Sequence, residues 1–275
     1  MGSVVYCETK ETVSPYMFSN TRVMAYSYEE ACYYIVNNPS LLSELDFSFD
    51  FASWVKDKLG LEELGEKIIK QLDAKENYER ILDSFLSAYN YLSREEISMF
   101  FERLKGVGLL KEHLRLKKQA DGYLKFEKYV RAIRLYRSIL KMPNLEESFV
   151  ATVYHNLGIA LAKNLEYNDA LKAFYEAYKL NSSEITLSCY LSIIFVTNQD
   201  LKDVNEDYRL ECDKEVYDSM LLRFKQGADG YINSDDGKLL SEVLEAKKYG
   251  RDKDAKIKVN KLIEKWKEDY RRQTT

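Results

Sequence analysis

Proline, glycine, cysteine and histidine are all scarce in this chain, and each shortage removes a class of structure. Only 3 prolines and 11 glycines occur among 275 residues, so long irregular segments are not expected and helix is favoured. The cysteines at positions 7, 32, 189 and 212 are widely spaced and form no C-x-x-C pair. We therefore expect reduced, mostly buried thiols in a cytoplasmic protein, with a Cys189–Cys212 disulfide as the less favoured alternative.

Long apolar runs and signatures of catalysis are missing as well. No stretch approaches the roughly 20 apolar residues that cross a bilayer, and no basic segment followed by an apolar run begins the chain, so we expect no membrane insertion. The two histidines, His113 and His155, do not have the H-E-x-x-H spacing of a zinc site, and no phosphate-binding loop or G-x-S-x-G turn occurs. We therefore expect no metal, no cofactor and no catalytic residue, and the chain is predicted not to be an enzyme.

Two stretches of the chain share one pattern of large and small residues at a spacing of 38 residues. The first set is Leu116, Ala120, Tyr123, Tyr129, Ala132, Tyr136 and Leu140. The second set is Tyr154, Gly158, Leu161, Tyr167, Ala170, Phe174 and Tyr178. A helical hairpin of this length cannot bury its apolar face alone and must stack on neighbouring hairpins. The repeat therefore predicts an array of helices, which in proteins is usually a binding surface.

The second stretch resembles the tetratricopeptide repeat (TPR) family. The resemblance is carried by Tyr154-His155-Asn156-Leu157-Gly158-Ile159-Ala160-Leu161 and by Tyr167, Ala170, Phe174 and Ala177. It is specific over 151–182, fair over 113–144, where Ala120 replaces the usual glycine, and degenerate from 183 to 272. It implies an all-α fold, a right-handed superhelical solenoid with repeats at about 113–146, 151–182, 184–231 and 238–272.

In that family the first helix of each hairpin lines a groove that binds a peptide or helix of a partner protein. The resemblance thus implies a non-catalytic adaptor or scaffold, with groove candidates at Lys117, Asp121, Lys125, His155, Ile159 and Lys163. Some relatives clamp a terminal carboxylate with lysines and asparagines. Here Lys117 and Asn156 match that clamp, but Asp121 stands where an asparagine is needed. A carboxylate facing a carboxylate is repulsive, so this ligand class is disfavoured.

Residues 1–112 show no such resemblance and are expected to form a separate helical region, followed by a repeat domain over 113–275. Apolar β-branched and aromatic residues at Val4–Cys7 and over 16–26 predict a short β-hairpin at 4–26. Ser27 with Glu30 and Ser93 with Glu96 have the spacing of capping boxes. Helices are expected near 50–59, 61–73, 76–91 and 94–105, and Gly106-Val107-Gly108 is expected to be a linker.

Two other functions and one other surface stay open. A peptide-sensing bacterial regulator also uses TPR arrays, and an enzyme would need an unrecognised site in 1–112, near Trp54 or Tyr78. Residues 247–272 carry eleven basic and five acidic residues, and a binding patch for an acidic partner or an RNA backbone is the less favoured interpretation of this segment. Because Ala255, Val259, Leu262, Ile263 and Trp266 form an apolar stripe there, we expect a helix that caps the solenoid. Nucleic acid is an unfavoured partner for a chain with a net charge of −4.

Overall fold

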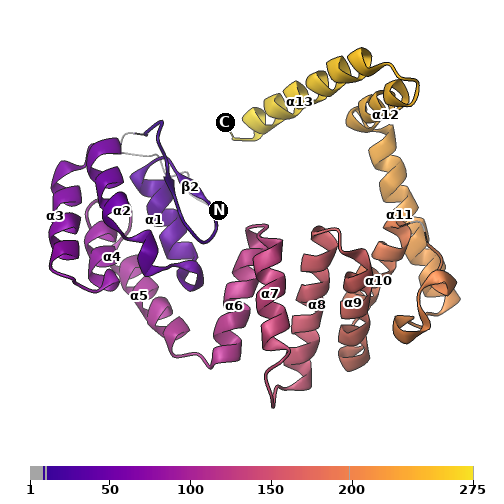
Figure 1. The fold of residues 1–275 in the computed structure, drawn as a ribbon, viewed down its shortest axis with the longest axis horizontal. Coiled ribbons are helices and arrows are strands. Elements are labelled where there is room, and N and C mark those ends of the chain that lie inside the picture. The colour runs from indigo at the N-terminus through magenta and orange to yellow at the C-terminus, as the bar shows by residue number, and fades with distance from the viewer. Residues whose placement is uncertain (1–8, 10, 198, 275) are drawn as a thin grey trace. The chain divides into compact units, whose positions relative to one another are not determined.

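The computed structural model describes residues 9, 11–197 and 199–274, and most of them are helical (Figure 1). Thirteen α-helices and one two-stranded sheet occur in this part of the chain, which confirms the all-α expectation. The contacts divide the chain into two compact units between Ser182 and Ser183. Each unit is described by itself.

The first unit begins with a small β-hairpin. Strands β1 (Tyr16–Met17) and β2 (Met24–Ala25) pair antiparallel, with Tyr16 opposite Ala25. Arg22 closes the turn with a left-handed backbone (φ 57°), and its N–H donates to the carbonyl of Phe18 at 2.8 Å. Both strands thus lie within the second of the two segments expected to pair. The other segment, Val4–Cys7, lies outside the described residues.

Five helices follow the hairpin and enclose an aromatic core. They are α1 (Tyr28–Asn37), α2 (Phe49–Ser53), α3 (Glu62–Asp73), α4 (Tyr78–Leu86) and α5 (Arg94–Gly108). Trp54–Lys58 continues α2 as one π-helical turn. Tyr28, Phe18, Phe51 and Phe85 are fully buried in the core that these elements share. Large rings bury much apolar area each, so this core stabilises the N-terminal helices together.

The helix ends agree with the sequence in part. Ser93 and Glu96 form the expected capping box, in which each side chain accepts from the backbone N–H of the other. At α1, Ser27 Oγ accepts from Glu30 N as expected, but the Glu30 carboxylate accepts from the N–H of Tyr26. The expected linker over 106–108 is wrong, because α5 continues through both glycines with ordinary helical backbone.

Helices α6 (Glu112–Lys125), α7 (Tyr129–Ile139), α8 (Glu147–Lys163) and α9 (Tyr167–Asn181) complete the first unit. Each packs on the next in sequence, and α6 also contacts α8. A Cβ at Gly158 would lie 2.6 Å from Cε1 of Phe174. This glycine therefore allows α8 and α9 to approach closely, as its position in the repeat pattern predicts.

Helix α6 also packs on the N-terminal helices. A Cβ at Gly122 would lie 2.9 Å from Cδ1 of Leu41, and the rings of Tyr34 and Phe126 are 5.9 Å apart. Leu41 belongs to a 3-10 turn, Pro39–Leu41, that follows α1. The division expected between 112 and 113 thus falls inside a compact unit, and a separate domain over 1–112 stays a prediction.

The second unit contains α10 (Glu184–Val196), α11 (Lys214–Asn233), α12 (Asp235–Lys248) and α13 (Asp252–Thr274). The polar segment after α10 holds two 3-10 turns, Leu201–Asp203 and Glu206–Tyr208. The hydroxyl of the buried Tyr190 in α10 anchors this polar segment by donating to the carbonyl of Tyr208 at 2.9 Å. Cys189 and Cys212 are free thiols, so the alternative of a disulfide between them is wrong.

Helix α13 packs on α12 through Ala255, which forms a buried cluster with Val243 and Ala246, and Leu262 of α13 is buried as well. Ile263 and Trp266 remain 40% and 47% exposed, so the apolar stripe expected there is only partly covered. Two of the α13 lysines form ion pairs with α12, Lys258 with Glu242 and Lys265 with Asp236. None of the helices in the described part of the chain combines the length and apolar character that crossing a bilayer requires.

Candidate functional site

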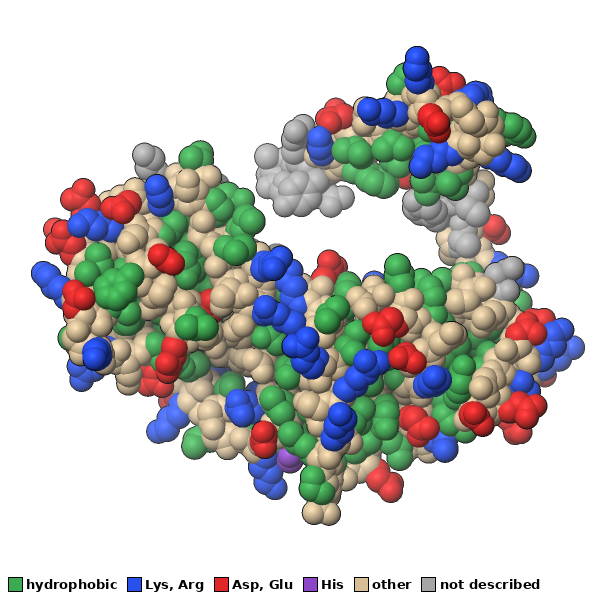
Figure 2. All heavy atoms as spheres, in the orientation of Figure 1, with side chains coloured by type: hydrophobic (Ala, Val, Ile, Leu, Met, Phe, Trp, Pro, Cys, Tyr) green, Lys and Arg blue, Asp and Glu red, His purple; other side chains and the backbone are tan. Residues whose placement is uncertain are grey.

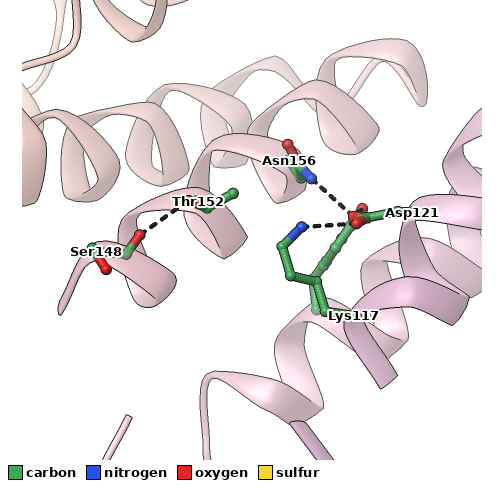
Figure 3. A network of polar contacts seen from close by, with 6 residues as sticks. Lys117, Asp121, Ser148, Thr152 and Asn156 are labelled. Atoms are coloured by element: carbon green, nitrogen blue, oxygen red, sulfur yellow. Dashed lines mark hydrogen bonds and ion pairs between the residues drawn. The ribbon is translucent and has the colours of Figure 1, made fainter. Parts of the chain in front are cut away.

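Three side chains, one each from α6, α7 and α8, converge on the carboxylate of Asp121. Figure 3 shows two of them, Lys117 and Asn156, pointing toward Asp121. Lys117 Nζ lies 2.7 Å from Oδ2, one helical turn away on α6. The hydroxyl of Tyr136 donates to Oδ1 at 2.6 Å, and the amide of Asn156 donates to the same atom at 2.9 Å. The α6–α8 contact places Asn156 beside Asp121, 35 residues away in sequence.

This network changes the interpretation of the predicted clamp positions. Lys117 and Asn156 both bond to the chain's own carboxylate, so the charge of Asp121 is paired internally instead of facing a ligand. Tyr136 is fully buried. Burial, together with the hydrogen bond to Asp121 and its negative charge, raises the pKa of Tyr136 well above its ordinary value. The phenol is therefore a neutral, permanent donor that holds α7 to α6.

The other predicted groove residues do not join this network. His155 is half-buried, with its ring 5.7 Å from that of Phe174, and burial lowers the pKa of its imidazole from 6.5. Ile159, one turn further along α8, is half-buried as well. Lys125 and Lys163 are exposed at the ends of α6 and α8. Of the six predicted residues, Lys117 and Asp121 contact each other directly.

A cleft in the N-terminal part of the same unit has the shape of a binding site. Two adjoining cavities, of about 730 Å³ and 510 Å³, share Tyr33, Asn37 and Tyr91. The larger lies against α5, with Leu92, Met99 and Arg103 in its wall. The smaller extends over the β-hairpin to the end of α6, where Lys125 and Phe126 border it. We call this continuous surface the Tyr33 cleft.

The Tyr33 cleft combines exposed apolar side chains with charged groups. Tyr33 is 64% exposed, Met99 54% and Met24 50%. Lys125 Nζ stands 5.5 Å from the centroid of the Phe126 ring. Glu96 also lines the cleft, and hydrogen bonds from the Ser93 backbone and hydroxyl lower the pKa of its carboxyl. An apolar surface with a charged rim suits a segment of another protein.

Sequence reasoning found one residue of this cleft, Lys125, and missed the rest. The wall comes from the β-hairpin, α1, the segment before Ser93 and α5, and these lie far apart in sequence without a shared motif. A signal was present in Tyr33, which stands among the apolar residues of α1 next to the buried Tyr34. The buried residues of this ten-residue helix include Cys32, Tyr34 and Ile35 but not Tyr33, which leaves its ring outside the core.

No group of three or more histidine, cysteine, aspartate or glutamate side chains is placed to hold a metal ion in the residues that the structure describes. Comparison with models of known protein families finds no match, and searches of the curated proteins and of the solved structures find none either.

Proposed function

We propose that this chain is a non-catalytic interaction module that holds a peptide segment or helix of a partner protein in the Tyr33 cleft. The observation that carries the proposal is the exposure of Tyr33, Met99 and Met24 around one continuous hollow. Exposed apolar side chains gathered in a concavity are typical of interaction sites. Tyrosine is a frequent anchor in such sites, and methionine adapts its shape to different partners.

The finer architecture belongs to the same proposal. We propose that α6–α9 are two TPR hairpins stacked in a right-handed array, continued less regularly by α10–α13. The sequential packing of α6–α9 and the close approach at Gly158 support it. In this arrangement α6 carries Lys125 from the repeat array to the rim of the Tyr33 cleft.

Two of the predicted groove residues, Lys125 and Lys163, distinguish binding in the Tyr33 cleft from binding in a groove along α6 and α8. Lys125 and Lys163 are both exposed and end their helices, but Lys125 borders the Tyr33 cleft and Lys163 is on α8. Lys125→Glu and Lys163→Glu make the same change of charge. If the partner lies in the cleft, only Lys125→Glu should weaken binding, whereas a partner in the repeat groove should respond to both.

The experiment is affinity capture from a lysate of the source organism with five baits. They are the wild type, Tyr33→Ala with Met99→Ala, the matched control Leu45→Ala with Leu109→Ala, Lys125→Glu, and Lys163→Glu. Leu45 and Leu109 are exposed apolar residues outside the cleft. A protein retained by the wild type and the control but lost from the cleft variant should then bind directly in calorimetry. Equal retention by all five baits would refute the cleft as the site.

A further inference from the structure

A second surface of the first unit is strongly basic. Between Lys128 and Leu145 the chain holds five basic residues and no acidic one, although its overall net charge is −4. These residues are Lys128, Arg131, Arg134, Arg137 and Lys141. Arg131, Arg134, Arg137 and Lys141 recur every three or four positions and so share one side of α7 and its C-terminal end, and Lys128 immediately precedes the helix. Figure 2 shows lysine and arginine side chains in a row over the α6–α7 part of the molecule. We call this the α7 basic surface.

The α7 basic surface is hollowed at two places. One cavity of about 480 Å³ lies among Val130, Ile133, Arg134, Arg137 and Lys141. The other, of about 450 Å³, adds Arg22, Lys128 and Arg131. Val130 lines both cavities and is 59% exposed. An apolar side chain thus stands between two concave sites whose rims are positive.

The charges on this surface differ in how they are held. Arg137 pairs with Asp169 at 3.1 Å, and Arg131 Nη1 donates to the carbonyl of Asn20 at 2.6 Å. These two guanidinium groups are therefore fixed in direction by the protein. Arg134 and Lys141 are exposed and form no ion pair within the described residues. Their charge is compensated by solvent alone and is available to a ligand.

We propose that the α7 basic surface binds an acidic segment of a partner protein, with carboxylates on Arg134 and Lys141 and an apolar side chain on Val130. Arginine binds carboxylates through paired, directed hydrogen bonds, and this geometry is specific. Six basic and two acidic side chains line the two cavities, the acidic ones being Glu127 and Glu166. A peptide can place its carboxylates only where the cations are, whereas a continuous phosphate backbone would also meet these two glutamates.

The apolar centre favours a peptide for a second reason. Val130 and Ile133 line the larger of the two cavities with aliphatic side chains. Single-stranded nucleic acid binds through exposed aromatic rings on which bases stack. The one ring in the lining, that of Tyr129, is half-buried. The surface is separate from the Tyr33 cleft, and the inference goes beyond the proposed function.

The test uses a short fluorescent peptide in which aspartate and glutamate flank one central leucine. Its affinity is measured by fluorescence anisotropy at low ionic strength for the wild type, Arg134→Glu with Lys141→Glu, and Arg134→Gln with Lys141→Gln. Lys67→Glu with Lys105→Glu is the matched control, since both lysines are exposed on other helices. Melting curves of all variants are expected to agree, because these side chains are exposed.

We expect the charge-reversed surface variant to weaken peptide binding about tenfold or more, the glutamine variant to weaken it less, and the control to keep wild-type affinity. Added salt should weaken the wild-type complex, and a peptide of asparagine and glutamine around leucine should not bind. The proposal fails if the acidic peptide does not bind the wild type, or binds every variant equally. It also fails if a single-stranded RNA of mixed sequence binds the wild type more tightly and depends on Arg134 and Lys141.

Discussion

At the scale of single residues, Asp121 shows how a group that looks like a ligand site can be an internal tie. Its carboxylate accepts from Lys117, Tyr136 and Asn156, which belong to three helices. Lys117 and Asn156, which match the clamp positions of the family that the chain resembles, both bond to Asp121 in the structure. The sequence did not show that these groups bond to Asp121 instead of to a ligand. The third donor, Tyr136 of α7, stands at a repeat position that was expected only to fill space in the core.

Asp121→Ala should destabilise the protein by about 1–3 kcal/mol, because the buried hydroxyl of Tyr136 loses its acceptor. The control is Asp169→Ala, which removes ion pairs on an exposed surface and should cost about 1 kcal/mol or less. Adding Tyr136→Phe to Asp121→Ala should recover part of the loss, since no orphan hydroxyl then remains. Urea unfolding measures all three. Equal losses for the two aspartate variants would show that the network does not stabilise the fold.

His155 should make stability fall at mildly acidic pH. Because burial lowers its pKa from 6.5, the unfolded chain binds a proton at a pH where the folded protein does not. The contribution of the neutral imidazole is fully present above about pH 6.5 and is lost as the pH falls toward the folded-state pKa. His155→Gln should therefore flatten the dependence of unfolding free energy on pH between about 7 and 5. Parallel curves for variant and wild type would contradict this assignment.

At the scale of elements, the contact between α8 and α9 depends on one missing side chain. Gly158→Ala would bring a Cβ to 2.6 Å from the buried ring of Phe174, and the overpacking should cost about 1–3 kcal/mol. Gly106→Ala in α5 is the control, because no atom lies within 4 Å of its added Cβ. Alanine is the better helix former, so this control should stabilise by up to about 1 kcal/mol. Thermal melting should move in opposite directions for the two variants.

The elements were predictable where periodicity and caps agree. The capping box at Ser93 and the helix expected over 61–73 were placed close to their observed positions, because the apolar period and the helix-start signals indicate the same element. The linker expected at Gly106 and Gly108 was wrong, because glycine lowers the stability of a helix but does not prevent it from continuing. The Tyr33 cleft could not be predicted, because its wall forms only when the hairpin, α1, α5 and the end of α6 pack together.

At the scale of the molecule, contacts within the first unit join the N-terminal helices α1–α5 to the helices α6–α9. Leu41 packs where a Cβ on Gly122 would stand, Tyr34 packs against Phe126, and Arg131 holds the carbonyl of Asn20. The same junction gives the Tyr33 cleft its border at Lys125 and the α7 basic surface its contribution from Arg22. Both proposed sites therefore require that the N-terminal helices and α6–α9 fold together as one cooperative unit.

A fragment of residues 1–182 should therefore fold cooperatively with a melting temperature independent of residues 183–275. A fragment of residues 1–112 should melt at lower temperature or not fold, because Leu41 and Tyr34 would lose the α6 residues that cover them. Circular dichroism of the two fragments, compared with the whole chain, distinguishes these outcomes. If the shorter fragment were as stable as the longer one, the N-terminal helices would be an independent domain. The Tyr33 cleft would then be a surface between two domains that can separate. Partner binding would depend on the fraction of molecules in which the two domains are in contact.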